Sequence, residues 1–183
     1  GIHGLRPSLG RVPMINYTTP DRHIGGQIMA VSGPLARSIE DLEIGLKVMS
    51  RENFDDPWWA PIPFSFEKPQ KKIALITEIE GLKVDPIIKN ELEMVAKKLE
   101  EAGWIIEQPK APNFHEAAKF QATLWLGEFR RTGGEAIKKE NDPDANFIFE
   151  QMSRRCPDTS LESFMDALQN RARISRNWHK FFD

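Results

Sequence analysis

The sequence is poor in the features that define several protein classes. It has a single cysteine, Cys156, among its 183 residues, which excludes an internal disulfide framework and favours a reducing, cytoplasmic location. No apolar run reaches the roughly 18 residues that span a bilayer, so we expect no membrane-embedded segment. Basic and acidic residues number 25 and 27, for a net charge of -2. This balance gives no electrostatic footprint for nucleic acid, and we expect no direct nucleic-acid partner.

Residue patterns that carry metal, nucleotide or nucleophile chemistry are also scarce. The histidines stand at widely separated positions without metal-ligand spacing: His3, His23, His115 and His179. Ser65 and Lys68 have the Ser-x-x-Lys spacing of some acyl enzymes, but they lie between Pro63 and Pro69, which disfavour the helix turn that this spacing needs. Paired carboxylates such as Asp55-Asp56 are expected to be solvated surface charge. We therefore predict no catalytic residue, no metal ligand and no cofactor in this chain.

The chain divides by composition into three segments within one expected domain. Residues 1–34 are rich in glycine and proline and predict loops. Residues 35–70 predict a helix followed by an arm rich in proline and aromatic residues, pinned by Trp58, Trp59 and Phe64. Residues 71–183 predict a β-α-β unit followed by helices. A chain of this length with 40% apolar residues can bury one sizeable core.

Local signals place the main helices and strands. Ser38 with Asp41 three residues later predicts a helix start, and apolar residues continue at helical spacing to Met49. Further helices are predicted to begin at Asn113, with Glu116, and at Thr159, with Glu162. We expect the last of these to run to the end of the chain.

A β-α-β unit is the clearest pattern in the sequence. Residues 72–77 form an apolar run of strand length, Asp85-Pro86 is a helix start, Gly103 ends the helical stripe, and residues 104–108 form a second apolar run. Such a unit implies two parallel strands with a right-handed crossover. The expected fold class is α/β.

Two ordered motifs then identify a family resemblance. The opening GIHGLRPSLGRVP and the stretch SGPLARSIEDLEIGLKVM at 32–49 resemble the amidase signature family. The first motif matches at Gly1, Gly4, Leu5, Arg6, Pro7, Ser8, Gly10, Arg11 and Pro13. The second matches at Gly33, Pro34, Ala36, Arg37, Ser38, Glu40 and Asp41, and Leu35 stands where the family more often has Met.

The resemblance implies a fold and a chemistry for the parent protein. The fold would be part of a mixed β-sheet flanked by helices, incomplete at both ends. Family members hydrolyse a carboxamide C-N bond through a serine acyl-enzyme with a Ser-cisSer-Lys triad and no cofactor, and they carry these residues before the segment that matches Gly1. The Gly-Gly pairs of this chain are followed by Gln27 and Glu135, so neither supplies the serine. We therefore expect a fragment without catalytic residues, inactive alone.

The resemblance also implies a substrate and partners. The expected substrate is a small-molecule amide, and the segments that match the family's variable pocket contain Thr77, Glu78, Trp125 and Glu128 as predicted substrate-binding residues. Taken alone, the fragment should expose apolar sheet faces, so we expect association as a homo-oligomer or with a complementing fragment of the same protein. Two alternatives stay open: a non-catalytic α/β interaction or binding module, and part of a glutamyl-tRNA amidotransferase A subunit.

Overall fold

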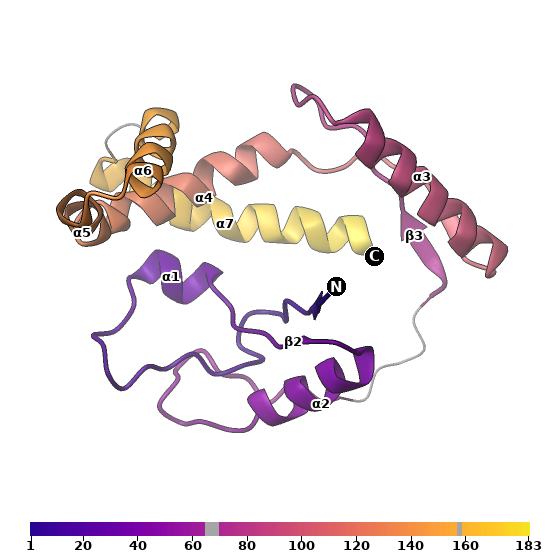
Figure 1. The fold of residues 1–183 in the computed structure, drawn as a ribbon, viewed down its shortest axis with the longest axis horizontal. Helices are drawn as coiled ribbons and strands as arrows, with labels where there is room; N and C mark the ends of the chain where they lie inside the picture. Colours follow the sequence, from indigo (N-terminus) through magenta and orange to yellow (C-terminus); the bar gives the residue numbers. More distant parts are fainter. Residues whose placement is uncertain (65–69, 157–158) are drawn as a thin grey trace. The chain divides into compact units, whose positions relative to one another are not determined.

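A computed structural model describes residues 1–64, 70–156 and 159–183 and gives the expected α/β composition (Figure 1). The elements in chain order are β1 (His3–Gly4), α1 (Ile24–Met29), β2 (Leu35–Ala36), α2 (Ile39–Met49), β3 (Lys72–Ala74), α3 (Pro86–Glu101), β4 (Ile105–Glu107), α4 (Phe114–Phe129), α5 (Gly133–Glu140), α6 (Pro143–Arg155) and α7 (Leu161–Phe182). The Ser65-x-x-Lys68 spacing and the end of the predicted arm lie outside the described residues. In the described part of the chain, no helix combines the length and apolar character needed to cross a bilayer.

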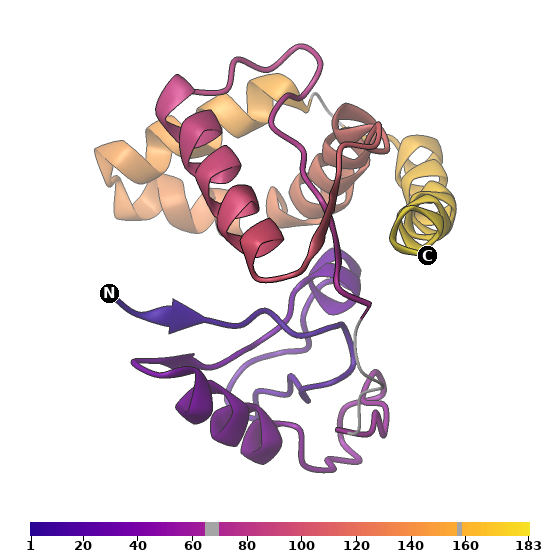
Figure 2. The same cartoon turned by 90° about the vertical axis from the view of Figure 1, so that its right-hand side faces the viewer.

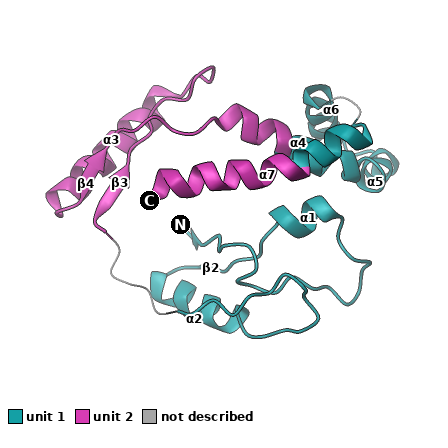
Figure 3. Ribbon diagram, turned by 180° about the vertical axis from the view of Figure 1, so that it is seen from behind, with its two compact units in different colours: residues 1–65, 121–167 teal, residues 66–120, 168–183 magenta. Residues whose placement is uncertain are grey.

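The chain folds into two compact units, each built from two stretches of sequence (Figure 3). Unit 1 comprises residues 1–65 and 121–167, and unit 2 comprises residues 66–120 and 168–183. Helices α4 and α7 each contribute residues to both units. The sequence-based domain assignment stays a prediction.

A short antiparallel ladder in unit 1 brings the two family motifs together (Figure 2). His3 pairs with Ala36 and Gly4 with Leu35, and the Leu5 N–H donates to the carbonyl oxygen of Pro34 at 3.1 Å. Gly33 is required at this contact, because the first side-chain carbon of any other residue would overlap the carbonyl oxygen of Leu5. Gly33 therefore allows two backbone segments to approach closely.

Helix α2 follows this ladder and begins where the sequence predicts. The Ser38 hydroxyl accepts a hydrogen bond from the Asp41 N–H at 3.1 Å, which is the expected N-cap. The helix buries Leu42 and Leu46 and ends at Met49. This prediction is confirmed to within one residue at both ends.

The aromatic side chains of the arm that follows α2 contact other segments of unit 1. The Trp59 indole N–H donates to the carbonyl oxygen of Ser50 at 3.3 Å, and the Trp58 indole N–H donates to Gln27 Oε1 at 3.1 Å. The Arg11 guanidinium lies 4.9 Å from the centre of the Phe64 ring, a cation–π contact. The prediction of a pinned arm is confirmed for these residues.

The β3-α3-β4 unit in unit 2 confirms the β-α-β prediction. Strands β3 and β4 pair in parallel with Lys72 opposite Ile105 and Ala74 opposite Glu107, although both are shorter than the apolar runs. The Asp85 carboxylate accepts from the Ile87 N–H at 2.8 Å and caps α3, with Pro86 at its first position.

The starts of the two long helices test the remaining predictions. Asn113 Oδ1 accepts from the Glu116 N–H at 3.0 Å at the start of α4, as expected. The predicted cap at Thr159 is wrong, because Ser160 Oγ accepts from the Ser163 N–H at 3.1 Å and α7 begins at Leu161. The buried Thr159 hydroxyl has no hydrogen-bond partner among the described residues.

Candidate functional site

A groove in unit 2 lies beyond the carboxyl ends of the two parallel strands. The loop 75–81 follows β3 and the loop 108–113 follows β4, and together with the first residues of α4 they line a groove of about 890 Å³. In open α/β sheets, ligands bind in the crevice outside the carboxyl ends of parallel strands. The predicted residues Thr77 and Glu78 lie side by side in this wall.

An ion pair fixes the charge of the groove wall at Glu78. Glu78 Oε1 lies 2.6 Å from Lys89 Nζ on α3. The hydrogen bond from Lys89 and its positive charge lower the pKa of Glu78, and the same contact raises the pKa of Lys89. The Glu78 side chain is 76% exposed, so the carboxylate is ionised and solvated. It can accept a hydrogen bond from an amide N–H of a ligand.

The end of the loop that follows β3 contacts the first turn of α4. His115 Nε2 is hydrogen-bonded to the carbonyl oxygen of Glu80. Gly81 has a φ of +75°, and a side chain there would approach His115 Nε2 to 3.3 Å. The loop after β3 is thereby held against the start of α4.

The other two predicted residues lie on the part of α4 that belongs to unit 1. Trp125 is half-buried, and Glu128 is half-buried with both carboxylate oxygens engaged. Glu128 Oε1 accepts from the Ile24 N–H at 3.0 Å, and Glu128 Oε2 accepts from the Gly25 N–H at 2.5 Å. The structure therefore brings Thr77 together with Glu78 in unit 2 and Trp125 together with Glu128 in unit 1. A substrate pocket shared by all four stays a prediction.

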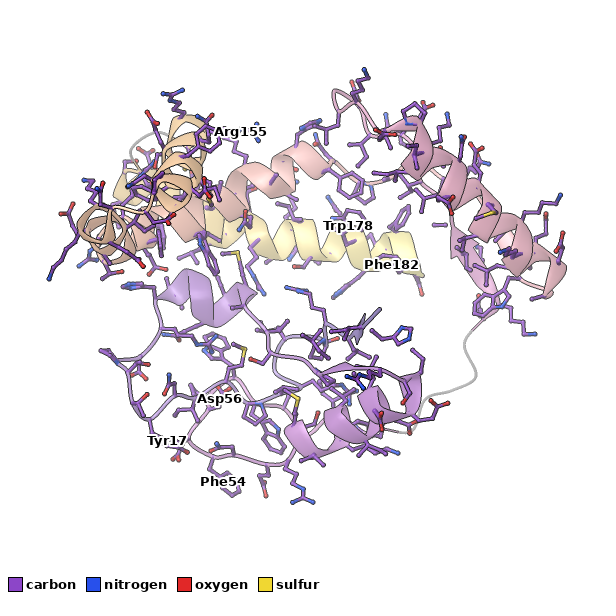
Figure 4. All side chains as sticks on the ribbon, in the orientation of Figure 1. Tyr17, Phe54, Asp56, Arg155, Trp178 and Phe182 are labelled. Atoms are coloured by element: carbon purple, nitrogen blue, oxygen red, sulfur yellow. The ribbon has the colours of Figure 1, made fainter. Side chains whose placement is uncertain are left out.

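A second cavity, in unit 1, was missed by the sequence analysis. It has a volume of about 420 Å³, is lined by residues 14–16, 19–22, 27 and 54–58, and lies where Figure 4 labels Tyr17, Phe54 and Asp56. The expectation of solvated charge is wrong for Asp56, which is buried and accepts hydrogen bonds from the Met14 N–H at 2.7 Å and the Trp58 N–H at 2.9 Å. The Asp-Asp pair was the available signal, but only the fold shows which carboxylate turns inward.

The described part of the chain contains no cluster of side chains that could bind a metal ion. No three histidine, cysteine, aspartate or glutamate side chains among residues 1–64, 70–156 and 159–183 come together as ligands. The groove offers hydrogen-bonding groups, among them Thr77, Glu78 and Lys89.

Comparison with solved structures shows the class of fold to which this arrangement belongs. A fatty acid amide hydrolase structure superposes with a TM-score of 0.75 over 99% of this chain, at 23% sequence identity. The aligned region is 33% of the hydrolase chain. The fold is therefore that of one part of an amide hydrolase domain.

The sequence comparisons then establish the family. The amidase family model matches residues 1–182, and the chain belongs to the amidase family. Two indoleacetamide hydrolases match all of the chain, one from Bradyrhizobium diazoefficiens at 28% identity and one from Bradyrhizobium japonicum at 27%. The chain spans 36% and 40% of the lengths of these relatives. The resemblance to the amidase signature family, which rests on the motifs at 1–13 and 32–49, is confirmed.

Proposed function

We propose that the complete protein hydrolyses a carboxamide C-N bond through a serine acyl-enzyme, and that this chain is a scaffold segment of that enzyme. The observation that carries the proposal is the amidase match over residues 1–182. The match includes the ladder of β1 and β2, where the two family motifs pair.

The proposed chemistry needs three residues that the resemblance places before Gly1. A serine Oγ attacks the amide carbonyl carbon while a cis-serine and a lysine take its proton and pass it to the departing nitrogen. Backbone N–H groups near the nucleophile stabilise the oxyanion. The C-N bond breaks, ammonia or an amine leaves, and water then hydrolyses the acyl-enzyme to a carboxylate.

The solvent-exposed area of the chain supports the proposal of a fragment that needs its complement. A compact monomer of 21.0 kDa exposes about 9,000 Å², and two separate compact proteins of the sizes of unit 1 and unit 2 expose about 10,800 Å² together. This chain exposes 14023 Å². Even as two independent units it would leave about 3,000 Å² more surface in water than compact proteins do. The chain alone is therefore proposed to be inactive and prone to association with itself or with a complementing fragment.

The names of the relatives suggest the substrates to try. Indoleacetamide carries an aromatic acyl group and a fatty acid amide carries a long aliphatic one, and both contain a carboxamide. The groove offers Glu78 as an acceptor for the amide N–H and Thr77 as a neutral donor or acceptor. We therefore propose a small-molecule amide as the substrate.

The test uses the complete protein and measures ammonia release from indole-3-acetamide and from a fatty acid amide. Replacing the serine after the upstream Gly-Gly pair by alanine should lower turnover by at least about a thousandfold. Glu135→Gln on α5 is the matched control, because Glu135 pairs only with the exposed Lys138 among the described residues and should leave turnover unchanged.

Three outcomes would contradict the proposal. Retained activity in the serine variant would exclude the nucleophile. Activity that appears only with a partner subunit and a transfer substrate would indicate an amidotransferase. Specific binding of a ligand without turnover of any amide would indicate a non-catalytic module.

A further inference from the structure

Helix α1 is too short and too rich in glycine to be stable by itself. It has six residues, Ile24 to Met29, and two of them are glycines. Isolated helices of this length do not persist in water, and each glycine lowers helix stability further. Its N-cap residue, His23, makes no capping hydrogen bond with its side chain. The contacts that hold α1 must come from elsewhere in the fold.

A carboxylate from α4 holds the first turn of α1. Glu128 accepts hydrogen bonds from the Ile24 N–H at 3.0 Å and from the Gly25 N–H at 2.5 Å, one on each oxygen. These N–H groups lack partners within the helix, and a negative charge is favoured at this end of a helix. Glu128 thus caps α1, although it lies 103 positions after Gly25 in the sequence.

The backbone of α1 lies directly against α4 at the same point. A side chain at Gly25 would place its first carbon 2.5 Å from the carbonyl oxygen of Leu124 and 3.0 Å from Glu128 Oε2. His23 Nε2 lies 3.0 Å from the Thr132 hydroxyl, which adds a contact just before the helix. The N-terminus of α1 is therefore held by α4 and the residues that follow it.

A guanidinium from the first family motif holds the other end of α1. Arg6 Nη2 donates to the carbonyl oxygen of Met29 at 3.1 Å. Carbonyl groups in the last turn of a helix lack internal partners, and a positive charge is favoured there. Arg6 directly follows Leu5, whose N–H bonds to Pro34 beside the β1–β2 ladder.

We propose that Glu128 is a positioning residue that fixes the segment 3–8 through α1 and Arg6. The inference rests on the proposed function, in which this segment adjoins the nucleophile loop. Glu128 accepts hydrogen bonds from the N-terminus of α1, and Arg6, within the segment 3–8, donates one to the carbonyl oxygen of Met29 at the end of α1. Glu128 is thus linked to the segment 3–8 through α1. The substrate contact predicted for Glu128 from the family resemblance is a different role, and the experiment separates the two.

The first arm of the test needs no activity. In the complete protein, Glu128→Gln keeps the size of the side chain but opposes one main-chain N–H with an amide NH₂ group. We expect amide hydrogens in residues 24–29 to exchange roughly tenfold faster, and those in residues 3–8 roughly threefold faster. Exchange in α2 should be unchanged. Unchanged exchange in residues 24–29 would overturn the proposal.

The second arm measures kcat and KM for both amide substrates. We expect Glu128→Gln to lower kcat roughly three- to tenfold for both substrates and to leave KM within about twofold. Arg6→Gln should have a similar effect, and the double variant should lose less than the product of the two single effects, because both act through α1. Additive effects would overturn the relay, and a raised KM for one substrate with kcat unchanged would assign Glu128 to substrate binding.

A control variant keeps these outcomes distinct. Glu135→Gln on α5 changes an exposed carboxylate that pairs with Lys138, and it should leave both kcat and the exchange of residues 3–8 and 24–29 unchanged. If the complete protein turns over no amide, the proposed function fails. The exchange measurements then still decide whether Glu128 orders α1 and the segment 3–8.

Discussion

Unit 1 buries apolar side chains from helices far apart in the sequence, whereas unit 2 leaves much of the apolar surface of α3 in contact with solvent. In unit 1, Leu42 and Leu46 of α2 and Leu124 and Leu126 of α4 are buried. Among the described residues of unit 2, the buried apolar residue is Ala96. Ile87 and Ile88, on the first turn of α3, are 72% and 55% exposed. Apolar burial, the main source of folding free energy, is therefore concentrated in unit 1.

Unit 2 depends instead on local caps, ion pairs and aromatic contacts. Glu116 and Arg173 form a two-pronged ion pair with distances of 2.6 and 3.2 Å. Trp178 lies edge-on to Phe114 at 5.1 Å and stacks on Phe182 at 5.9 Å, although Phe182 is 74% exposed (Figure 4). Exposed ion pairs contribute little free energy each. Unit 2 is therefore stabilised less by apolar burial than unit 1.

The largest expected effect comes from a substitution in the core of unit 1. Leu124 is 1% exposed, and Leu124→Ala should lower the free energy of unfolding of the complete protein by about 3 kcal/mol through lost burial and a cavity. Urea denaturation followed by tryptophan fluorescence measures the change. Phe54→Ala is the exposed control at 86% exposure and should change stability by less than about 0.5 kcal/mol. Equal effects of the two variants would contradict the assignment of the core.

A smaller effect is expected from the cap of α3 in unit 2. Asp85→Ala removes the acceptor of the Ile87 N–H and should cost about 1 kcal/mol. Hydrogen exchange across residues 86–101 is the measurement, and it should accelerate there more than in α2. The control is Asp85→Asn, which keeps a capping oxygen and should restore most of the protection. No change in Asp85→Ala would show that α3 is held by contacts other than its cap.

The smallest effect concerns the ion pair of Glu116 and Arg173. The hydrogen bond from Arg173 and its charge lower the pKa of Glu116, so the pair stabilises the fold above the ordinary glutamate pKa of 4.5. This stabilisation should be lost as the pH falls below 4.5 and through the lowered pKa of the folded state. The difference in melting temperature between the wild type and Glu116→Gln should shrink over that range. A difference that is constant from neutral pH to pH 3 would contradict the assignment.

Much of the fold could be predicted because its signals are local. Ser38 and Asp85 cap their helices as the sequence indicates, and the β3-α3-β4 unit has the expected parallel strands. Helix α6 was missed even though Asp142-Pro143 repeats the signal of Asp85-Pro86, and the Asp142 carboxylate accepts from the Ala145 N–H at 2.8 Å. The same local signal therefore marks the start of both helices.

Helix α1 and the buried Asp56 could not be predicted in the same way. The sequence IGGQIM has weak helix propensity, and α1 exists because Glu128 and Arg6 hold its ends. Asp56 is distinguished from Asp55 only by the direction in which the chain turns. The groove residues Thr77 and Glu78 came from the family resemblance, because no local signal marks a groove formed by two loops.

The contact at Gly33 gives one residue of the second family motif a structural role in the backbone crossing. A methyl group at this position would overlap the carbonyl oxygen of Leu5, so replacing Gly33 would force apart the two backbone segments that the ladder joins. Even the single carbon of an alanine side chain at Gly33 is therefore expected to separate the two motifs.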